Sequence, residues 1–402
     1  MEFDGVTDTT EDSTRVSFRV AQDDFADAVN WVAKNLPQKP VQPVLRGLVI
    51  TATDEGLTIE GFDYEVSTRV HVNAHVLETG RVAVAGRLLS EVVSVLVPGT
   101  IEVITDDNAT NLEIHSGSAN FTLPLIPLED YPKLPSIPAP SGTVDPHEFT
   151  VAVSQVAGAA GRDDALPMLT GIHVDIQGSE LVMAATDRFR LAIRRLPWQP
   201  QLSEAVSELL IPAKTLQETA RSLDTGINDP LTIAIGENLV GMVTDSRQTT
   251  TRLLDTDFPN IKPLLPKTHN FIATVDVNEM LRALKSVSIV ADRSGQVKLT
   301  FSAHSVVLAA ANTDTGVGSV EVPAAFVGSE DTLEIAFNPV YLREGLNVMH
   351  SDRAMFGFTD AHRSAILIPE PAEIPEAQAD GSYPAPESEL TYLIMPVRLP
   401  AA

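Results

Sequence analysis

The sequence LVMAATDRFRLAI at residues 181–193 decides the fold, because the same unit is written three times along the chain. Each version is an apolar strand, a polar turn that carries an aspartate, and a second strand. The leucine and the aspartate of the unit recur as Leu57 and Asp63, as Leu181 and Asp187, and as Leu308 and Asp314. The copies are spaced by roughly 125 residues, the size of a whole domain. This spacing indicates three copies of one fold rather than a solenoid.

Each copy is predicted to contain two helices. In the first copy, apolar residues follow Asp23 at helical spacing, and the pattern ends before Pro37. Asp23, Asp145 and Asp276 are the predicted caps of the opening helices. A second helix lies halfway along each copy, and its third version has Asn338 as the cap and Pro339 at the first helical position. Alternating apolar residues between the helices predict strands, so the fold class is α+β.

The predicted domain boundaries follow from these repeats. Residues 1–14 are polar and acidic and are expected to form a disordered tail. The three domains are expected at residues 15–136, 143–266 and 270–399, joined by proline-rich segments that act as semi-rigid connectors. The acidic segment 369–389 is low in core-forming residues and is expected to be a solvated loop between two strands.

The composition is that of an ordinary globular protein, with 44% hydrophobic and 20% charged residues among 402. The sequence shows neither a membrane-spanning apolar run nor a signal peptide, so a cytoplasmic location is expected. The absence of cysteine excludes disulfides and thiolate metal sites. A net charge of −26 argues against nucleic acid unless the basic residues gather on one surface.

Sequence motifs for catalysis are missing. The chain has no Gly-Lys pair for a phosphate-binding loop, no HExxH zinc motif and no GxSxG nucleophile motif. Residues 162–164, Arg-Asp-Asp, could hold Mg²⁺, but a charged loop after a helix is the favoured interpretation. We therefore expect no metal, no cofactor and no catalytic residues, because a threefold repeat is typical of a protein that acts through its shape.

Two motifs carry a family resemblance. The run YLIMPVRL at residues 392–399, together with ATDRFRL in the middle copy, resembles the bacterial DNA sliding clamp, the β subunit of DNA polymerase III, and the matching region includes FPN at residues 258–260. The resemblance covers residues 15–399 and implies three clamp-type domains, each with two helices on antiparallel sheets, closing into a ring as a homodimer. Twelve helices spaced by about 9 Å would leave a hole roughly 24 Å wide, which admits a DNA duplex.

The resemblance implies that basic residues on or beside the inner helices touch double-stranded DNA without sequence specificity. The candidates are Lys34, Lys39, Arg87, Arg162, Lys214, Arg221, Arg282, Lys285 and Arg343. Ordinary solvated helix residues are the alternative interpretation. The family pattern has aromatic residues at the two positions that Pro167 and Met168 occupy in this chain.

The resemblance also implies a groove that receives short partner peptides. Its candidate residues are Leu169, Thr186, Arg188, Phe189, Arg190, Leu191, Pro259, Leu264, Asn338, Tyr341, Leu393, Met395, Pro396, Val397 and Arg398. An apolar, methionine-containing surface adapts to varied anchors, and arginines orient the bound peptide. The alternative is that the same residues pack the second domain against the third. Arg188 and Phe189 replace a small residue and a histidine of the family pattern, which implies an altered peptide preference.

Ring closure is implied between the first domain of one subunit and the third domain of the next. Phe121 and Leu123 are the candidates on one side, and Ile289 and Val290 on the other. The implied function is to make the replicative DNA polymerase processive. The implied partners are the catalytic subunit of that polymerase, the clamp loader, and enzymes of DNA repair and ligation. A peptide-binding scaffold that does not encircle DNA is the alternative function.

Overall fold

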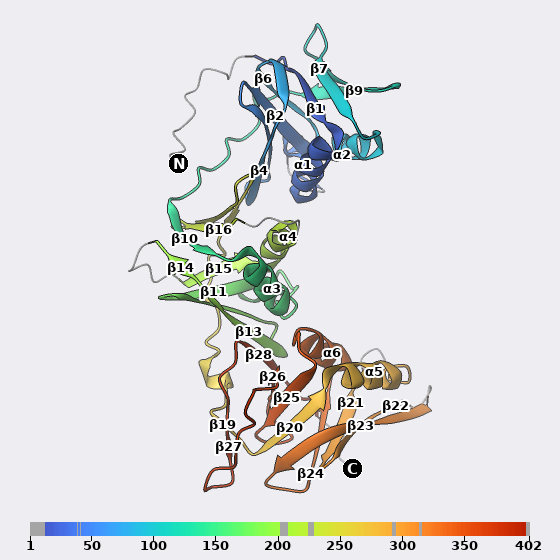
Figure 1. The fold of residues 1–402 in the computed structure, drawn as a ribbon, viewed down its shortest axis with the longest axis vertical. Coiled ribbons are helices and arrows are strands. Elements are labelled where there is room, and N and C mark those ends of the chain that lie inside the picture. The colour runs from blue at the N-terminus through green and yellow to red at the C-terminus, as the bar shows by residue number, and fades with distance from the viewer. Residues whose placement is uncertain are drawn as a thin grey trace. The chain divides into compact units, whose positions relative to one another are not determined.

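The computed structural model describes residues 13–37, 39–40, 42–201, 208–223, 229–291, 295–312 and 316–398. The predicted tail lies outside these residues except for its last two positions, and Asp314 of the third repeat also lies outside them. The chain forms two compact units. Unit 1 comprises Met1–Pro146 and Thr225–Leu253, and unit 2 comprises His147–Asp224 and Leu254–Ala402. The middle copy of the repeat therefore contributes to both units (Figure 1).

Unit 1 is an antiparallel sheet with two helices, α1 (Gln22–Asn35) and α2 (Gly86–Val95), and a short helix η1 (Pro43–Arg46). The strands are β1 (Ser17–Ala21), β2 (Gly47–Thr53), β3 (Gly56–Phe62), β4 (Val66–Val72), β5 (His75–Glu78), β6 (Gly80–Ala85), β7 (Thr100–Thr105), β8 (Asn111–Ser116), β9 (Ala119–Ile126), β10 (Pro140–Val144), β16 (Leu231–Ile235), β17 (Leu239–Val243) and β18 (Arg247–Arg252). Their order is β10-β16-β17-β18-β4-β3-β2-β6-β9-β8-β7-β1-β5.

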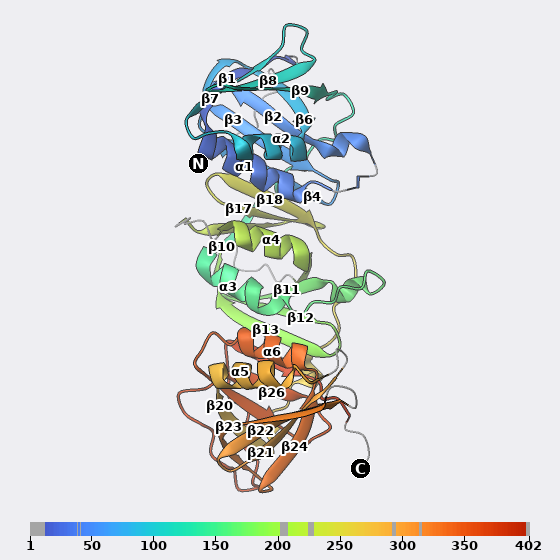
Figure 2. The ribbon, with the colours of Figure 1, turned by 90° about the vertical axis from the view of Figure 1, so that its right-hand side faces the viewer.

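The helices of unit 1 pack side by side on this sheet (Figure 2). Phe25, Val29 and Val32 of α1 are fully buried, as their helical spacing predicts. Gly61 of β3 lets α1 approach closely, since a Cβ there would lie 2.8 Å from Cγ1 of Val32. Between the helices, Ser90 donates a 2.5 Å hydrogen bond to Oδ1 of Asn30. Both helices are thus fixed on one face of the sheet.

Unit 2 contains four α-helices in its described residues: α3 (Pro146–Ala157), α4 (Ala213–Leu223), α5 (Val277–Val287) and α6 (Pro339–Asn347). Its strands are β11 (Gly171–Gln177), β12 (Glu180–Thr186), β13 (Arg190–Pro197), β14 (Gln199–Pro200), β15 (Glu208–Pro212), β19 (Thr268–His269), β20 (Phe271–Asp276), β21 (Val297–Ser302), β22 (Ser305–Asn312), β23 (Gly316–Gly328), β24 (Thr332–Phe337), β25 (Arg353–Phe358), β26 (Ala365–Pro369), β27 (Tyr383–Pro384) and β28 (Leu390–Ile394). Two short helices are η2 (Pro167–Leu169) and η3 (Lys262–Leu264).

Strand pairing crosses the boundaries between repeats in both units. The large sheet of unit 2 has the order β15-β11-β12-β13-β28-β26-β25-β20-β23-β22-β21-β24. Strand β13 of the middle repeat pairs with β28 of the last one, with Leu191 opposite Leu393. In unit 1, β18 of the middle repeat pairs with β4 of the first, with Thr249 opposite Thr68. Since both pairings are antiparallel ladders, each joins two repeats into one continuous sheet.

The helices of unit 2 form a row on one side of its sheet (Figures 1 and 2). Thr150 of α3 donates to the carbonyl of Ala220 in α4, at 3.2 Å. Gln155 of α3 donates to the carbonyl of Val348 at the end of α6, at 2.8 Å. Helix α6 in turn packs beside α5. The order along the row is therefore α4, α3, α6 and α5.

The predicted helix caps are correct in the third repeat and wrong in the first. Asp276 accepts from the backbone N–H of Glu279 at 2.8 Å, and Asn338 accepts from Val340 at 2.9 Å. Asp23 is not a cap, because α1 starts one residue earlier, at Gln22, and runs directly on from β1. Asp23 lies instead in the first helical turn, where a carboxylate is favoured by the helix dipole.

The repeated aspartate forms the same turn in two copies. Oδ1 of Asp63 accepts from the backbone of Glu65 and Val66 between β3 and β4. Oδ1 of Asp187 accepts from Phe189 and Arg190 between β12 and β13. The aspartate is therefore a turn residue, which satisfies two backbone donors where the strands reverse.

The acidic segment 369–389 does lie between two strands, β26 and β28, as predicted. It also contains β27, which the sequence did not predict. Strand β27 pairs with β19, with Tyr383 opposite His269. The segment is thus anchored to unit 2 at its middle.

Candidate functional site

An exposed apolar surface lies in unit 2, where the turn between β12 and β13, helix α6, helix η3 and the C-terminal segment provide its residues. The exposed fractions are 51% for Phe189, 48% for Leu264, 40% for Val397 and 39% for both Met395 and Val340. Large apolar side chains left in water mark interaction sites when they cluster.

Backbone hydrogen bonds and a ring contact fix Phe189, Met395 and Val397 of this surface. The N–H of Met395 donates to the carbonyl of Phe189 at 2.8 Å, and the N–H of Val397 donates to that of Ala336, also at 2.8 Å. The ring of Phe189 stacks on that of Tyr341, with centroids 6.0 Å apart and planes 20° apart. The C-terminal segment is thus fixed against the turn after β12 and against the strand that precedes α6.

Several candidate groove residues lie beneath this surface. Leu191 and Leu393 are 1% and 2% exposed and belong to a core cluster that also contains Ile366. Phe258, Ile261 and Leu265 cover the same cluster from the segment around η3. Leu169 and Thr186 are likewise buried, and Oγ1 of Thr186 donates to the carbonyl of Arg190 at 2.6 Å. These residues support the surface rather than form its exposed face.

Arg190 is the charged residue at the centre of the site, and it is buried. Its Nε lies 3.1 Å from Oδ2 of Asp187, its Nη1 forms an ion pair with Glu344 of α6, and its guanidinium stacks 4.5 Å from the ring centroid of Tyr341. Two carboxylates therefore surround one guanidinium. The sequence interpretation missed Glu344, although it stands three residues after Tyr341 and so shares a helix face with it.

Tyr392 lies under this cluster. Its hydroxyl donates to the carbonyl of Tyr341 at 3.3 Å, and burial raises its pKa to about 12. The ring packs against Gly345, where an added Cβ would lie 2.7 Å from the ring carbons Cδ1 and Cε1. The tyrosine stays protonated at neutral pH and fixes α6 against β28.

The remaining groove candidates are more open. Arg188, Pro259 and Arg398 are exposed, whereas Asn338, Tyr341 and Pro396 are half-buried. Asn338 uses its side chain to cap α6. The surface thus combines an apolar centre with exposed arginines near two of its edges.

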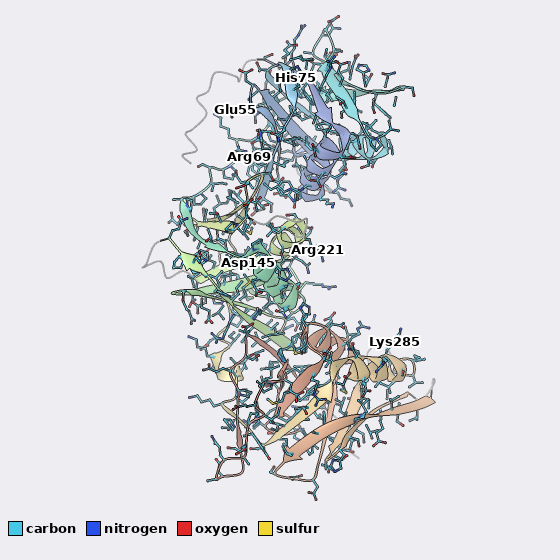
Figure 3. All side chains as sticks on the ribbon, viewed as in Figure 1. Glu55, Arg69, His75, Asp145, Arg221 and Lys285 are labelled. Carbon is cyan, nitrogen blue, oxygen red and sulfur yellow. The ribbon has the colours of Figure 1, made fainter. Side chains whose placement is uncertain are left out.

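The candidate DNA residues are all exposed, in both units. On the helices of unit 2, Lys214 and Arg221 belong to α4, Arg282 and Lys285 to α5, and Arg343 to α6. Figure 3 labels Arg221 and Lys285 on the side of unit 2 that bears the helices. In unit 1, Lys34 and Arg87 lie on α1 and α2, and Arg87 also donates to the carbonyl of Leu36 at 3.1 Å. Lys39 follows α1, and Arg162 follows α3.

The helices are less acidic than the rest of the chain. Asp27, Glu148 and Glu344 account for part of their negative charge, and each forms an ion pair with an arginine of a strand. The six described α-helices together carry eight acidic and seven basic residues, whereas the whole sequence has 54 acidic and 28 basic ones.

Two strand edges are open in the described residues. From Ala119 to Pro124, β9 pairs with β8 alone, and from Gly316 to Pro323, β23 pairs with β22 alone. Ile289 and Val317 beside the second edge are 79% and 78% exposed, and Val290 packs near Gly318. At the first edge, Phe121 is half-buried, whereas Leu123 is 6% exposed and belongs to the core of unit 1.

The described residues contain no group of three or more side chains suited to hold a metal ion. Their helices are also too short or too polar to cross a lipid bilayer.

Repeated strand–turn–strand units, an exposed apolar surface and exposed basic residues on the helices are typical of an accessory binding protein. Comparison with known proteins agrees. Three family models match the chain: the DNA polymerase III beta subunit N-terminal domain at residues 16–135, its central domain at 143–260 and its C-terminal domain at 262–377. The chain belongs to the DNA polymerase III beta subunit family, the bacterial sliding clamps.

Individual relatives extend over nearly the whole chain. The beta sliding clamp of Streptomyces coelicolor is 41% identical over 389 residues, covering 96% of this chain and 100% of the relative. The beta sliding clamp homolog GriR of Streptomyces muensis is 39% identical, with 95% and 99% covered. The crystal structure of the Bacillus subtilis sliding clamp matches with a TM-score of 0.86 at 25% identity, with 96% and 100% covered. The protein is accordingly a non-catalytic processivity factor of DNA replication, and the scaffold unrelated to DNA is not favoured.

Proposed function

We propose that this chain forms a homodimeric ring that encircles double-stranded DNA in the cytoplasm and tethers the catalytic subunit of the replicative polymerase to it. The observation that carries the proposal is the row α4, α3, α6 and α5 on one face of unit 2, with exposed basic residues along it. Such a face suits contact with phosphates that is independent of sequence. We propose three domains per subunit with the predicted boundaries.

The dimer would close through the two open strand edges. The edge of β9 in one subunit would pair with the edge of β23 in the next, and the exposed Ile289 and Val317 would be buried. Pairing removes an exposed edge, which is otherwise a site of aggregation. A head-to-tail contact of this kind closes when the rotation between subunits completes a ring.

The DNA experiment compares two DNA shapes. When the dimer is loaded on nicked circular DNA, it should co-elute with the DNA in gel filtration. When the same DNA is cut once to make it linear, the dimer should be lost from the DNA, because a ring slides off a free end. Equal retention on circular and linear DNA would contradict encirclement. Light scattering supplies the second measurement, since a monomer at micromolar concentration would contradict the dimer.

We propose that the exposed apolar surface of unit 2 receives short peptides of the polymerase, the clamp loader and enzymes of DNA repair and ligation. Its support is the exposure of Phe189, Met395 and Val397 beside the buried arginine Arg190. One solved clamp with 22% identity, from Pseudomonas aeruginosa, was crystallised with griselimycin bound. A small number of central residues should carry most of the affinity.

Met395→Ala is the direct test of this surface, because it removes an exposed side chain whose backbone stays hydrogen-bonded. The binding free energy of a labelled leucine- and phenylalanine-containing peptide should weaken by about 1–2 kcal/mol. Ile374→Ala is the matched control, since Ile374 is 40% exposed but lies in the acidic segment. Unchanged affinity in both Met395→Ala and Arg398→Ala would refute the assignment of this surface.

A further inference from the structure

Arg188 has an unusual backbone conformation at the edge of the apolar surface. Its φ angle is +79°, in the left-handed region, and the turn is held by Oδ1 of Asp187. Glycine adopts this conformation freely, whereas a residue with a Cβ is strained in it.

The first repeat offers an internal comparison. Its equivalent turn places Tyr64 at φ +74°, with Asp63 in the place of Asp187. The backbone conformation is therefore shared by the two described copies of this turn. Their side chains differ, and in the middle repeat the side chain at this position is an arginine next to the exposed Phe189.

The two arginines of the turn differ in their availability. Arg190 is buried and engaged by Asp187 and Glu344. These groups together carry one net negative charge, so they do not favour a further carboxylate. Arg188, in contrast, is exposed, with its guanidinium carbon 6.0 Å from the ring centroid of Phe189. A ligand that covers Phe189 must therefore also cover the guanidinium of Arg188.

We infer that Arg188 is a specificity-determining residue that selects partner peptides carrying a carboxylate beside the apolar anchor that covers Phe189. This inference rests on the proposed peptide-binding function. Covering a guanidinium removes water from it, and the loss is offset only when the ligand supplies an acceptor. A carboxylate supplies a charged one, so it should be favoured over a neutral amide of the same shape.

The test measures fluorescence anisotropy with pairs of labelled ten-residue peptides. Both members carry leucine and phenylalanine anchors, and they differ only by Glu or Gln at one position flanking the anchors, scanned on both sides. The unaltered full-length protein should prefer the Glu peptide at one position by about fivefold at low salt. Arg188→Gln should abolish this preference, so that the Glu and Gln peptides of each pair bind with the same affinity.

Tyr64→Gly is the matched control, because it alters the equivalent turn in unit 1 and leaves the turn at Arg188 unchanged, and it should keep the full preference. High salt should reduce the preference in the unaltered protein. If both peptides bind without a Glu preference at any position, or if Arg188→Gln keeps the preference, the inference about Arg188 is overturned and the peptide site stands. If neither peptide binds, the proposed peptide site fails, and the inference fails with it.

Discussion

His269 makes the stability of unit 2 depend on pH. The residue is 1% exposed, neither of its ring nitrogens has a hydrogen-bond partner among the described residues, and its ring packs directly on Gly357 of β25. Burial lowers its pKa from 6.5 to about 4. Folding therefore favours the neutral ring, and the stabilisation is complete above pH 6.5 and declines as the pH falls from 6.5 towards 4.

The size of the effect follows from the two pKa values. Between pH 7.5 and pH 5 the unfolded chain gains about 2 kcal/mol from protonating this histidine, whereas the folded protein gains almost nothing. Below pH 4 the total loss approaches about 3 kcal/mol. A buried, unpaired imidazolium would also disrupt the short pairing between β19 and β27, because His269 lies opposite Tyr383.

Urea denaturation at pH 7.5 and pH 5 measures this effect, with the fluorescence of Trp198 reporting on unit 2 in a Trp31→Phe background. His269→Phe is the comparison, since phenylalanine has a similar ring and does not titrate. Other groups titrate alike in both proteins, so the difference between their pH dependences isolates His269. Equal losses of unfolding free energy in the two proteins would refute the reasoning.

Three further predictions concern the helices α5 and α6. Asn338→Ala removes the cap of α6 and should lower the unfolding free energy of unit 2 by about 1 kcal/mol in urea denaturation, with Asp276→Ala giving a similar loss for α5. Gly345→Ala should be destabilising despite the better helix propensity of alanine, because its Cβ would press on Tyr392, whereas Gly158→Ala meets no atom within 4 Å and should not lower the melting temperature. Lys285→Glu should shorten retention on nicked circular DNA and make the slope of log binding constant against log salt concentration shallower by about one. The control Lys267→Glu, in the connector before β19, should leave the retention and the slope unchanged.

Local features of the fold could be predicted from the sequence because they depend on neighbouring residues. The caps Asp276 and Asn338 and the turn at Asp187 follow from short-range hydrogen bonds, and α1 ends before Pro37 as predicted. Asp23 failed as a cap because the same local pattern fits a residue in the first turn of a helix equally well. Periodicity also identified the buried face of α1, where Phe25, Val29 and Val32 are fully buried.

Features set by distant residues could not be predicted in this way. The pairings of β13 with β28 and of β18 with β4 depend on registers between strands far apart in the chain. The ion pair between Arg190 and Glu344 depends on the pairing of β13 with β28, because this pairing brings α6 next to the turn after β12. The left-handed conformation of Arg188 was also not visible, since most residues at such positions are glycine or asparagine.

The division of the middle repeat between two units has a consequence for recombination. Exchanging that repeat as a cassette between relatives would cut two sheets at once, because its halves pair with different neighbours. Crossovers placed together at residues 146–147, 224–225 and 253–254 exchange whole units and keep each of the two ladders within one parent. Chimaeras joined there should keep both ladders, so the modules that tolerate shuffling are offset by half a repeat from those that were originally duplicated.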